Sequence, residues 1–303
     1  MHTDTPFAAH LKLFGMAAVW GASWPWGRMV AQAMPPLTAA GLRFGVASIV
    51  LLIWLWHRGG LAALKTWRMQ RWIVMLVAAA IGVFGYATCF MLGLRHVPAS
   101  KAALVITLNP ALTLLLAAWL FGERLSGQIG FGMLLAVAGS LVVITHGEPW
   151  RLLDGSVGIG QLFLLGCVVC WSIYTLIGRH MLAGIDALTA TAVTATLGAC
   201  MLLISGFCLE GSVGFAAAVT APLQAWSALL ALAFIATAIA YAWYFSGVQM
   251  LGAGTAAAYI TLVPIFGVLF SSWWLGEMID ASVAIGGGLA IVGMAMMQHG
   301  RRA

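Results

Sequence analysis

The sequence predicts an all-α integral membrane protein with ten transmembrane helices, arranged as two inverted repeats of five helices each. Three observations support this fold class. The 303 residues are 63% hydrophobic and only 7% charged, with a mean hydropathy of +1.03, whereas about a quarter of the residues of a soluble domain are charged. Long apolar runs follow one another along the chain. Two of these runs share the same motif at the same internal spacing.

The apolar runs have the length of membrane-spanning helices. A helix rises about 1.5 Å per residue, so roughly 20 residues cross a hydrocarbon core about 30 Å thick. Strands of a membrane barrel would alternate in polarity, whereas these runs are continuously apolar. They cover residues 11–30, 37–56, 72–93, 102–121, 127–145, 158–178, 188–208, 225–246, 255–275 and 281–298. We expect the first run to be retained and not cleaved as a signal peptide, because it has a counterpart later in the chain.

Basic residues near the ends of the runs predict the orientation. Cytoplasmic loops of membrane proteins are enriched in Lys and Arg. With the N-terminus in the cytoplasm, nine basic residues fall on the cytoplasmic side and five on the other, largely because of the 57–71 loop. We therefore expect both termini to be cytoplasmic. The lipid bilayer then accounts for the net charge of +6, which gives no reason to expect a nucleic-acid partner.

The shared motif belongs to a longer internal repeat. Residues 102–143 align without gaps on residues 256–297, and the segment from Trp20 to Arg28 matches the segment from Trp171 to Arg179. The sequence therefore predicts two domains, residues 1–150 and residues 151–303, each a five-helix repeat. The matched pairs include Thr107 with Thr261, Pro110 with Pro264, Trp119 with Trp273, Gly122 with Gly276, Glu123 with Glu277 and Gly139 with Gly293.

The number of helices in each repeat predicts a function. Because five is odd, equivalent helices of the two halves cross the membrane in opposite directions. Inverted repeats of this kind are typical of secondary transporters, in which a central site opens to each side of the membrane in turn. The alternatives are a membrane-embedded enzyme, for which no catalytic cluster is visible, and a channel, which saturable flux would distinguish from a carrier.

Several of these segments together resemble a known family, the ten-helix EamA-type members of the drug/metabolite transporter superfamily. The resemblance covers essentially the whole chain. It implies a monomeric transporter of a bacterial-type inner membrane, with a central cavity lined mainly by the first four helices of each half. It also implies small metabolites as substrates, with amino-acid exporters well represented. The segments that carry it are Trp20-Gly21-Ala22-Ser23 to Arg28, Arg43-Phe44, Pro110 to Glu123, Trp171 to Arg179, and Pro264 to Glu277.

Two prolines predict breaks in the fourth and ninth helices. Pro110 and Pro264 each remove an amide donor and free the carbonyl four residues earlier, at Ile106 and Ile260. An unsatisfied carbonyl is costly in hydrocarbon, so it should face protein, water or substrate. Alternatively, the prolines only shape kinks and the neighbouring threonines bond to their own helices. The candidate binding residues beside the breaks are Thr107, Asn109 and Thr261.

Aromatic residues gather in the helix interiors as well as near the interfaces. Each Trp or Tyr offers an apolar face and one polar group, which suits a pocket for a largely apolar solute. Interface belts and core packing are the competing explanation for most of them. The candidates for substrate binding are Trp20, Trp24, Tyr86, Trp171, Tyr174, Tyr241, Tyr244 and Tyr259.

Charged residues inside the runs are almost absent. Arg43 is the one charge well within a run, where insertion costs about 2.5 to 3.5 kcal/mol. It could pair with a substrate carboxylate or extend to the outer surface. No acidic residue, His or Lys lies in the middle of a run, so no proton-binding carboxylate is evident. We expect Glu123 and Glu277, at helix ends, to be structural.

These features predict the export of small neutral or zwitterionic metabolites, most plausibly hydrophobic or aromatic amino acids, through a central aromatic-lined cavity. The alternative substrates are another small metabolite, such as a nucleoside or sugar derivative, or a drug. We expect no cofactor. We also expect no metal, because Cys167 and Cys170 form a C-x-x-C without a second pair of ligands.

Overall fold

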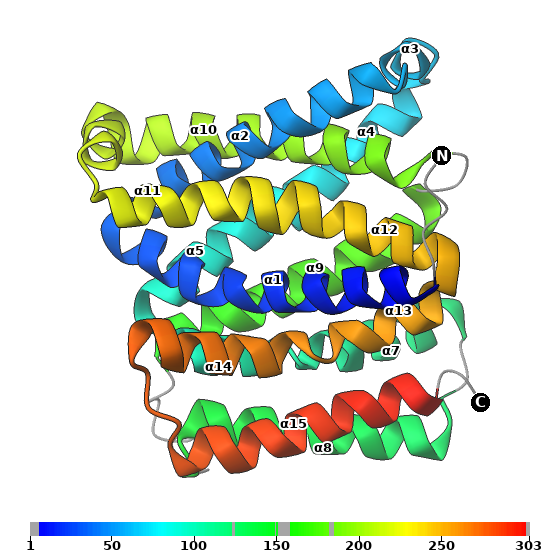
Figure 1. The fold of residues 1–303 in the computed structure, drawn as a ribbon, viewed down its shortest axis with the longest axis vertical. Helices are drawn as coiled ribbons and strands as arrows, with labels where there is room; N and C mark the ends of the chain where they lie inside the picture. Colours follow the sequence, from blue (N-terminus) through cyan, green and yellow to red (C-terminus); the bar gives the residue numbers. More distant parts are fainter. Residues whose placement is uncertain (1–5, 123–124, 149, 151–157, 182–184, 301–303) are drawn as a thin grey trace.

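The computed structural model describes residues 6–122, 125–148, 150, 158–181 and 185–300 (Figure 1). The regular structure of these residues is entirely helical. In the first half the elements are α1 (Pro6–Ala33), α2 (Pro36–His57), α3 (Leu61–Leu64), α4 (Met69–Ala79), the π-helix η1 (Ala80–Gly85), α5 (Tyr86–His96), α6 (Ala99–Val105), α7 (Leu108–Phe121) and α8 (Gly127–Thr145).

The second half repeats this order. Its elements are α9 (Ile159–Met181), α10 (Ala187–Val219), α11 (Leu223–Leu230), the π-helix η3 (Ala231–Ile239), α12 (Ala240–Leu251), α13 (Ala253–Ile260), α14 (Val263–Leu275) and α15 (Ala281–Gly300). The predicted boundary between the halves, at residues 150 and 151, adjoins residues 151–157, which lie outside the described part of the chain.

Nine segments of the described chain are long and apolar enough to cross a membrane. α4, η1 and α5 together make one of them, as do α6 with α7, α11 to α12, and α13 with α14. α1 is long enough at 28 residues but is less apolar, because Trp, Gly and Pro replace many aliphatic residues in it. The beginning of α1 and the end of α15 lie at the same end of the bundle (Figure 1).

Equivalent helices of the two halves pack against equivalent helices of the opposite half. α1 packs against α12 and α14 of the second half, and its counterpart α9 packs against α5 and α7 of the first. α2 pairs with α10, and α8 pairs with α15. Figure 1 shows these two pairs at opposite edges of the molecule, with α1 and α9 between them. This reciprocal pattern is what two repeats related by a two-fold axis produce, so the predicted all-helical membrane fold with two repeats is confirmed. Of the ten predicted spans, nine meet the length and apolarity of a membrane crossing among the described residues.

Glycines allow α8 and α15 to approach closely. A Cβ atom on Gly139 would lie 2.4 Å from the carbonyl oxygen of Gly286 and from the amide nitrogen of Ala290. The matched Gly293 meets the Gly132 carbonyl in the same way, at 2.5 Å. Backbone lies directly against backbone here, as in membrane helix pairs built on small residues. The repeat therefore conserves this glycine between the halves for close packing.

Each half also contains a π-helix at the equivalent place in its third span. η1 and η3 precede Tyr86 and Ala240 directly, and the hydroxyl of Thr237 in η3 donates to the Leu232 carbonyl over 3.0 Å. The indole N–H of Trp20 on α1 donates to the Ala236 carbonyl of η3 at 3.0 Å. π-Helical turns leave the regular hydrogen-bond ladder and are frequent at functional sites. The sequence analysis did not predict either one.

The structure interrupts the fourth and ninth spans just before the two prolines. α6 ends at Val105 and α7 begins at Leu108, whereas α13 ends at Ile260 and α14 begins at Val263. The expectation of a free carbonyl at Ile106 is wrong, because that oxygen accepts the Asn109 amide at 2.9 Å. A tight turn satisfies the group that the missing proline donor leaves behind.

Candidate functional site

Eight of the predicted binding residues come together between the two halves. With two phenylalanines they form what we call the aromatic zone. Trp20 on α1 packs edge-on against Tyr241 on α12, with ring centroids 5.4 Å apart, and also contacts Tyr244 at 5.6 Å. The members of the aromatic zone are Trp20, Trp24, Arg43, Phe44, Tyr86, Phe90, Trp171, Tyr174, Tyr241 and Tyr244.

A second string of rings runs through α1, α5 and α9. Trp24 contacts Phe90 at 5.2 Å, and Phe90 stacks on Tyr86 at 6.1 Å. Tyr86 contacts Trp171 at 5.8 Å, and Trp171 contacts Tyr174 at 6.2 Å. The first and second halves of the chain therefore contribute neighbouring rings to one surface. Trp24 is buried, whereas the other six Trp and Tyr members of the two strings are partly accessible: Trp20, Tyr86, Trp171, Tyr174, Tyr241 and Tyr244.

Arg43 on α2 connects the two strings. Its guanidinium carbon lies 5.0 Å from the centre of the Phe44 ring and 5.5 Å from the centre of the Phe90 ring. It also lies within electrostatic range of Tyr86 and Tyr241, and Tyr241 lies within that range of Tyr174. The Nε atom of Arg43 is buried without a hydrogen-bond partner. Phe44 and Phe90 were not among the predicted binding residues.

Three other predicted binding residues, Thr107, Thr261 and Tyr259, make their hydrogen bonds outside this group. Tyr259 nevertheless packs against the same hydrophobic cluster as Trp20 and Tyr244. The Thr107 and Thr261 hydroxyls each donate to a carbonyl of their own helix at 2.6 Å, those of Leu104 and Ala258. Tyr259 contacts His10 near the start of α1, with 2.9 Å between the Tyr hydroxyl and Nδ1. Ten residues separate His10 from Trp20, which corresponds to about 15 Å along a helix.

Asn109 adjoins the aromatic zone through α9. Its backbone carbonyl accepts the Ser172 hydroxyl at 3.4 Å, and Ser172 follows Trp171 directly. The side-chain oxygen of Asn109 is buried and has no hydrogen-bond partner. A buried polar atom of this kind costs free energy unless water or a ligand satisfies it. Asn109 therefore keeps an acceptor available beside the site.

Glu277 ties four helices together at one end of the bundle. Its carboxylate accepts the backbone amides of Ala99 and Ser100, both at 2.8 Å, and the Ser100 hydroxyl at 2.6 Å. Arg28 lies 3.3 Å from the same carboxylate and donates to the Leu94 and Val97 carbonyls. Glu277 is thus structural, as expected. Its counterpart Glu123 lies outside the described residues.

Glu210 makes the same kind of cap on α2. It accepts the Leu37 and Thr38 amides at 2.9 and 2.8 Å and the Thr38 hydroxyl at 2.7 Å. The helix that carries it runs past the predicted run 188–208, and Gly211 breaks its backbone with a φ of 66°. Sequence reasoning missed this cap, because the two partners are more than 170 residues apart.

A third polar contact joins α6 to α8 and α15. The ammonium group of the buried Lys101 lies 2.8 Å from Asp280 Oδ2 and 2.8 Å from His146 Nδ1. Burial raises the pKa of Asp280, but hydrogen bonds from Lys101, Ser282 and the Val283 amide outweigh it, so the pKa lies well below its usual value. Asp280 lies between two spans, outside the hydrocarbon region.

Asp280→Asn is expected to lower the free energy of unfolding by about 1 to 2 kcal/mol at pH 7, because it leaves the buried Lys101 ammonium without its carboxylate. A lowered pKa in the folded state stabilises the protein above the unfolded pKa of about 3.9. The difference between wild type and variant should therefore shrink as the pH falls below about 4. Thermal unfolding in detergent between pH 7 and pH 3 measures this difference in stability. A difference that does not change with pH would contradict the stabilising role of the Asp280 carboxylate.

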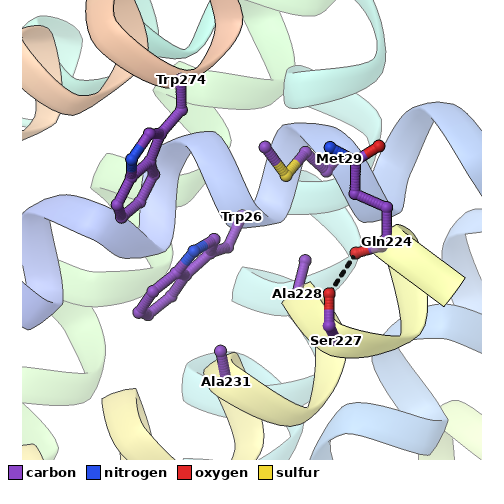
Figure 2. Close-up of a pocket in the computed structure, with 7 residues that line it drawn as sticks. All are labelled: Trp26, Met29, Gln224, Ser227, Ala228, Ala231 and Trp274. Carbon is purple, nitrogen blue, oxygen red and sulfur yellow. Dashed lines mark hydrogen bonds between the residues drawn. The ribbon is translucent and has the colours of Figure 1, made fainter.

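The described residues also form a pocket of about 410 Å³, shown in Figure 2. It lies between α1, the α11–η3 segment and α14, and its lining residues include no member of the aromatic zone. Trp26 and Trp274 stack in it, with centroids 5.6 Å apart and planes at 14°. Gln224 and Ser227 form its polar edge. Trp26 lies two residues before Arg28 and Trp274 three before Glu277, so the pocket adjoins the contact between those two residues.

The two helical halves pack reciprocally against each other and have an aromatic surface between them. This arrangement defines the class of the protein, a two-repeat membrane transporter. The model of the EamA-like transporter family matches residues 8–145 and again residues 158–298. The chain belongs to the EamA-like transporter family.

Known proteins of similar sequence are transporters too. The uncharacterized transporter YyaM of Bacillus subtilis (strain 168) is 27% identical over 285 residues, which are 94% of this chain and 92% of that protein. A probable terminal-alkyne amino-acid exporter of Streptantibioticus cattleyicolor is 27% identical over 264 residues, covering 86% and 84%. The aromatic amino acid exporter YddG of Ancylobacter novellus is 31% identical over 149 residues, covering 49% and 50%.

A solved crystal structure has the same fold. It superposes on this chain with a TM-score of 0.66 at 25% sequence identity, and it covers 97% of this chain and 98% of that chain. The similarity therefore extends over both halves of the molecule.

Proposed function

We propose that this protein is a secondary transporter that exports small neutral or zwitterionic metabolites, most strongly hydrophobic or aromatic amino acids, by alternating access. The observation that carries the proposal is the aromatic zone, in which rings from α1 and α5 meet rings from α9 and α12 around Arg43. Because both halves contribute to this surface, a movement of one half against the other would open it to either side of the membrane.

The chemistry of the aromatic zone suits an amphipathic solute. Trp and Tyr rings bind apolar groups through their faces and polar groups through an N–H or O–H. Two relatives, the probable terminal-alkyne amino-acid exporter and the aromatic amino acid exporter, are named for solutes with these properties. Both names support amino acids over nucleosides, sugar derivatives and drugs as the substrates of this chain.

The described acidic residues at the span ends support transport without proton coupling. Asp186, Glu210, Glu277 and Asp280 each accept backbone amides at the start of a helix. Their carboxylates therefore have structural partners, and none lies in the middle of a span. We propose facilitated export down the solute gradient by a functional monomer.

The proposed location is a bacterial-type inner membrane with both termini in the cytoplasm. The excess of basic residues in the 57–71 loop supports this orientation. The position of the beginning of α1 and the end of α15 at one end of the bundle supports placing the two termini on the same side (Figure 1). α1 would then be the tenth membrane span.

Flux into proteoliposomes tests the proposal. Purified protein is reconstituted and supplied with labelled neutral, aromatic, acidic and basic amino acids, with and without an imposed pH gradient. Saturable flux of neutral or aromatic amino acids that the gradient does not change is the expected result. If no amino acid is transported but a nucleoside or sugar derivative is, the proposed substrate class is wrong and the proposed transport activity stands.

A further inference from the structure

Among the described residues, Arg43 differs from Arg28 and Lys101 in having no acidic partner. Among the described residues it makes no hydrogen bond and no salt bridge, although it lies within the span Pro36–His57. Arg28 pairs with Glu277, and Lys101 pairs with Asp280. The chain thus neutralises these two cations internally and leaves the third unneutralised.

The neighbours of Arg43 compensate its charge only in part. The faces of Phe44 and Phe90 attract the guanidinium through cation–π contacts. Ring faces, however, do not replace the acceptor that each guanidinium N–H requires, and the buried Nε has none. Tyr86 and Tyr241 are neutral phenols. An unpaired charge within a span is unfavourable unless water or an anion reaches it.

Extension of Arg43 to the membrane surface does not fit its surroundings. The guanidinium lies over Phe90, which is buried, and beside Tyr86 and Tyr241, which come from the third span of each half. Glu210, the acidic residue that contacts α2, is committed to the amides of Leu37 and Thr38. The anion that completes this site must therefore come from outside the described chain.

We infer that Arg43 binds the carboxylate of the transported solute, while the rings of the aromatic zone hold its apolar part. A guanidinium offers a planar fork of N–H donors that matches the two oxygens of a carboxylate. The substrates are then zwitterionic amino acids with a free carboxylate, and organic acids that carry this group should bind to the same site. Neutral nucleosides, sugars, amides and amines are excluded. This inference rests on the proposed function, because it assumes that the aromatic zone is the transport site.

A matched set of ligands distinguishes recognition of the carboxylate from recognition of the rest of the solute. Phenylalanine and 3-phenylpropionate carry it, whereas phenylalaninamide and phenethylamine do not. In proteoliposomes, the first two are expected to compete for phenylalanine flux, and the last two to compete at least about tenfold more weakly, since a charge-assisted pair contributes at least that factor. Equal competition by the amide would overturn the inference and leave the proposed function intact.

Three variants test the residue itself. Arg43→Gln is expected to raise the KM for phenylalanine by at least about tenfold. Arg43→Lys keeps the positive charge but loses the planar fork of N–H donors. Its KM should therefore lie between those of wild type and Arg43→Gln. Arg95→Gln removes a positive charge from the exposed end of α5 and should leave the KM unchanged. An unchanged KM in Arg43→Gln would overturn the inference.

Unfolding measurements distinguish binding from a structural role. Removing an unpaired buried charge should not destabilise the protein, so Arg43→Gln is expected to melt no lower than wild type in the absence of solute. A lower melting temperature would mean that the fold itself uses this charge, which contradicts the inference.

The same assay applies if no amino acid is transported. The proposed substrate class then fails, but 3-phenylpropionate should still raise the melting temperature of wild type, whereas phenethylamine and Arg43→Gln with either compound should show no rise. If no carboxylate stabilises the wild-type protein, the inference fails as well.

Discussion

Glu277→Ala is expected to lower the free energy of unfolding by about 3 to 5 kcal/mol, because it removes one partner of a largely buried ion pair. The side chains of Arg28 and Glu277 are only 18% and 11% exposed. The variant would also leave the Ala99 and Ser100 amides at the start of α6 without their acceptor. Reversible unfolding in mixed micelles measures the loss.

Glu210→Ala is the matched control. Glu210 accepts the same set of groups, two amides and one hydroxyl, at the start of α2, but it has no salt bridge among the described residues. Glu210→Ala should lower the free energy of unfolding by about 1 to 2 kcal/mol, as for other helix caps. The difference between the two variants then measures the contribution of Arg28. Equal losses would show that the ion pair adds nothing to capping.

Tyr241→Ala and Trp171→Ala are expected to reduce kcat/KM for an aromatic amino acid by at least about tenfold, with little loss of folded protein. Each substitution removes one ring from the proposed solute-binding surface, and an aromatic contact is worth about 0.5 to 1.5 kcal/mol beyond the area that it buries. Tyr241 packs against Trp20, and Trp171 packs against Tyr86, so the two variants disrupt different strings. Proteoliposome flux measures the effect.

Trp273→Ala provides the control for ring removal. Trp273 is 75% exposed on the outer surface of the bundle, where lipid would surround it. Its flux should equal that of wild type. Unchanged flux in both Tyr241→Ala and Trp171→Ala would remove these residues from the site, whereas a similar drop in all three would indicate a general effect on the membrane-embedded protein.

The fold could be predicted from the sequence because each part of the prediction depends on short-range patterns. Apolar runs of about 20 residues define spans wherever they occur. The spacing of Pro110 and Pro264 located both helix breaks. The hydropathy of α1 is the weak point, since Trp and Gly make it less apolar than the other spans.

The features that could not be predicted from the sequence depend on contacts between residues far apart in the chain. Nothing in the segments 80–85 and 231–239 distinguishes a π-helix from an α-helix, because both are apolar and the extra residue is accommodated by partners such as Trp20. The roles of Glu210, Lys101 and Asp280 require partners 45 to 179 residues away.

The pairing of α8 with α15 and of α2 with α10 has a consequence for the origin of the chain. Each of these pairs joins a helix to its own counterpart in the other half. Gly139 and Gly293 make equivalent contacts across the first pair. Two identical five-helix polypeptides, inserted in opposite orientations, would form these same contacts as a homodimer. Gene duplication and fusion of such a polypeptide would preserve the interfaces while allowing each half to change separately.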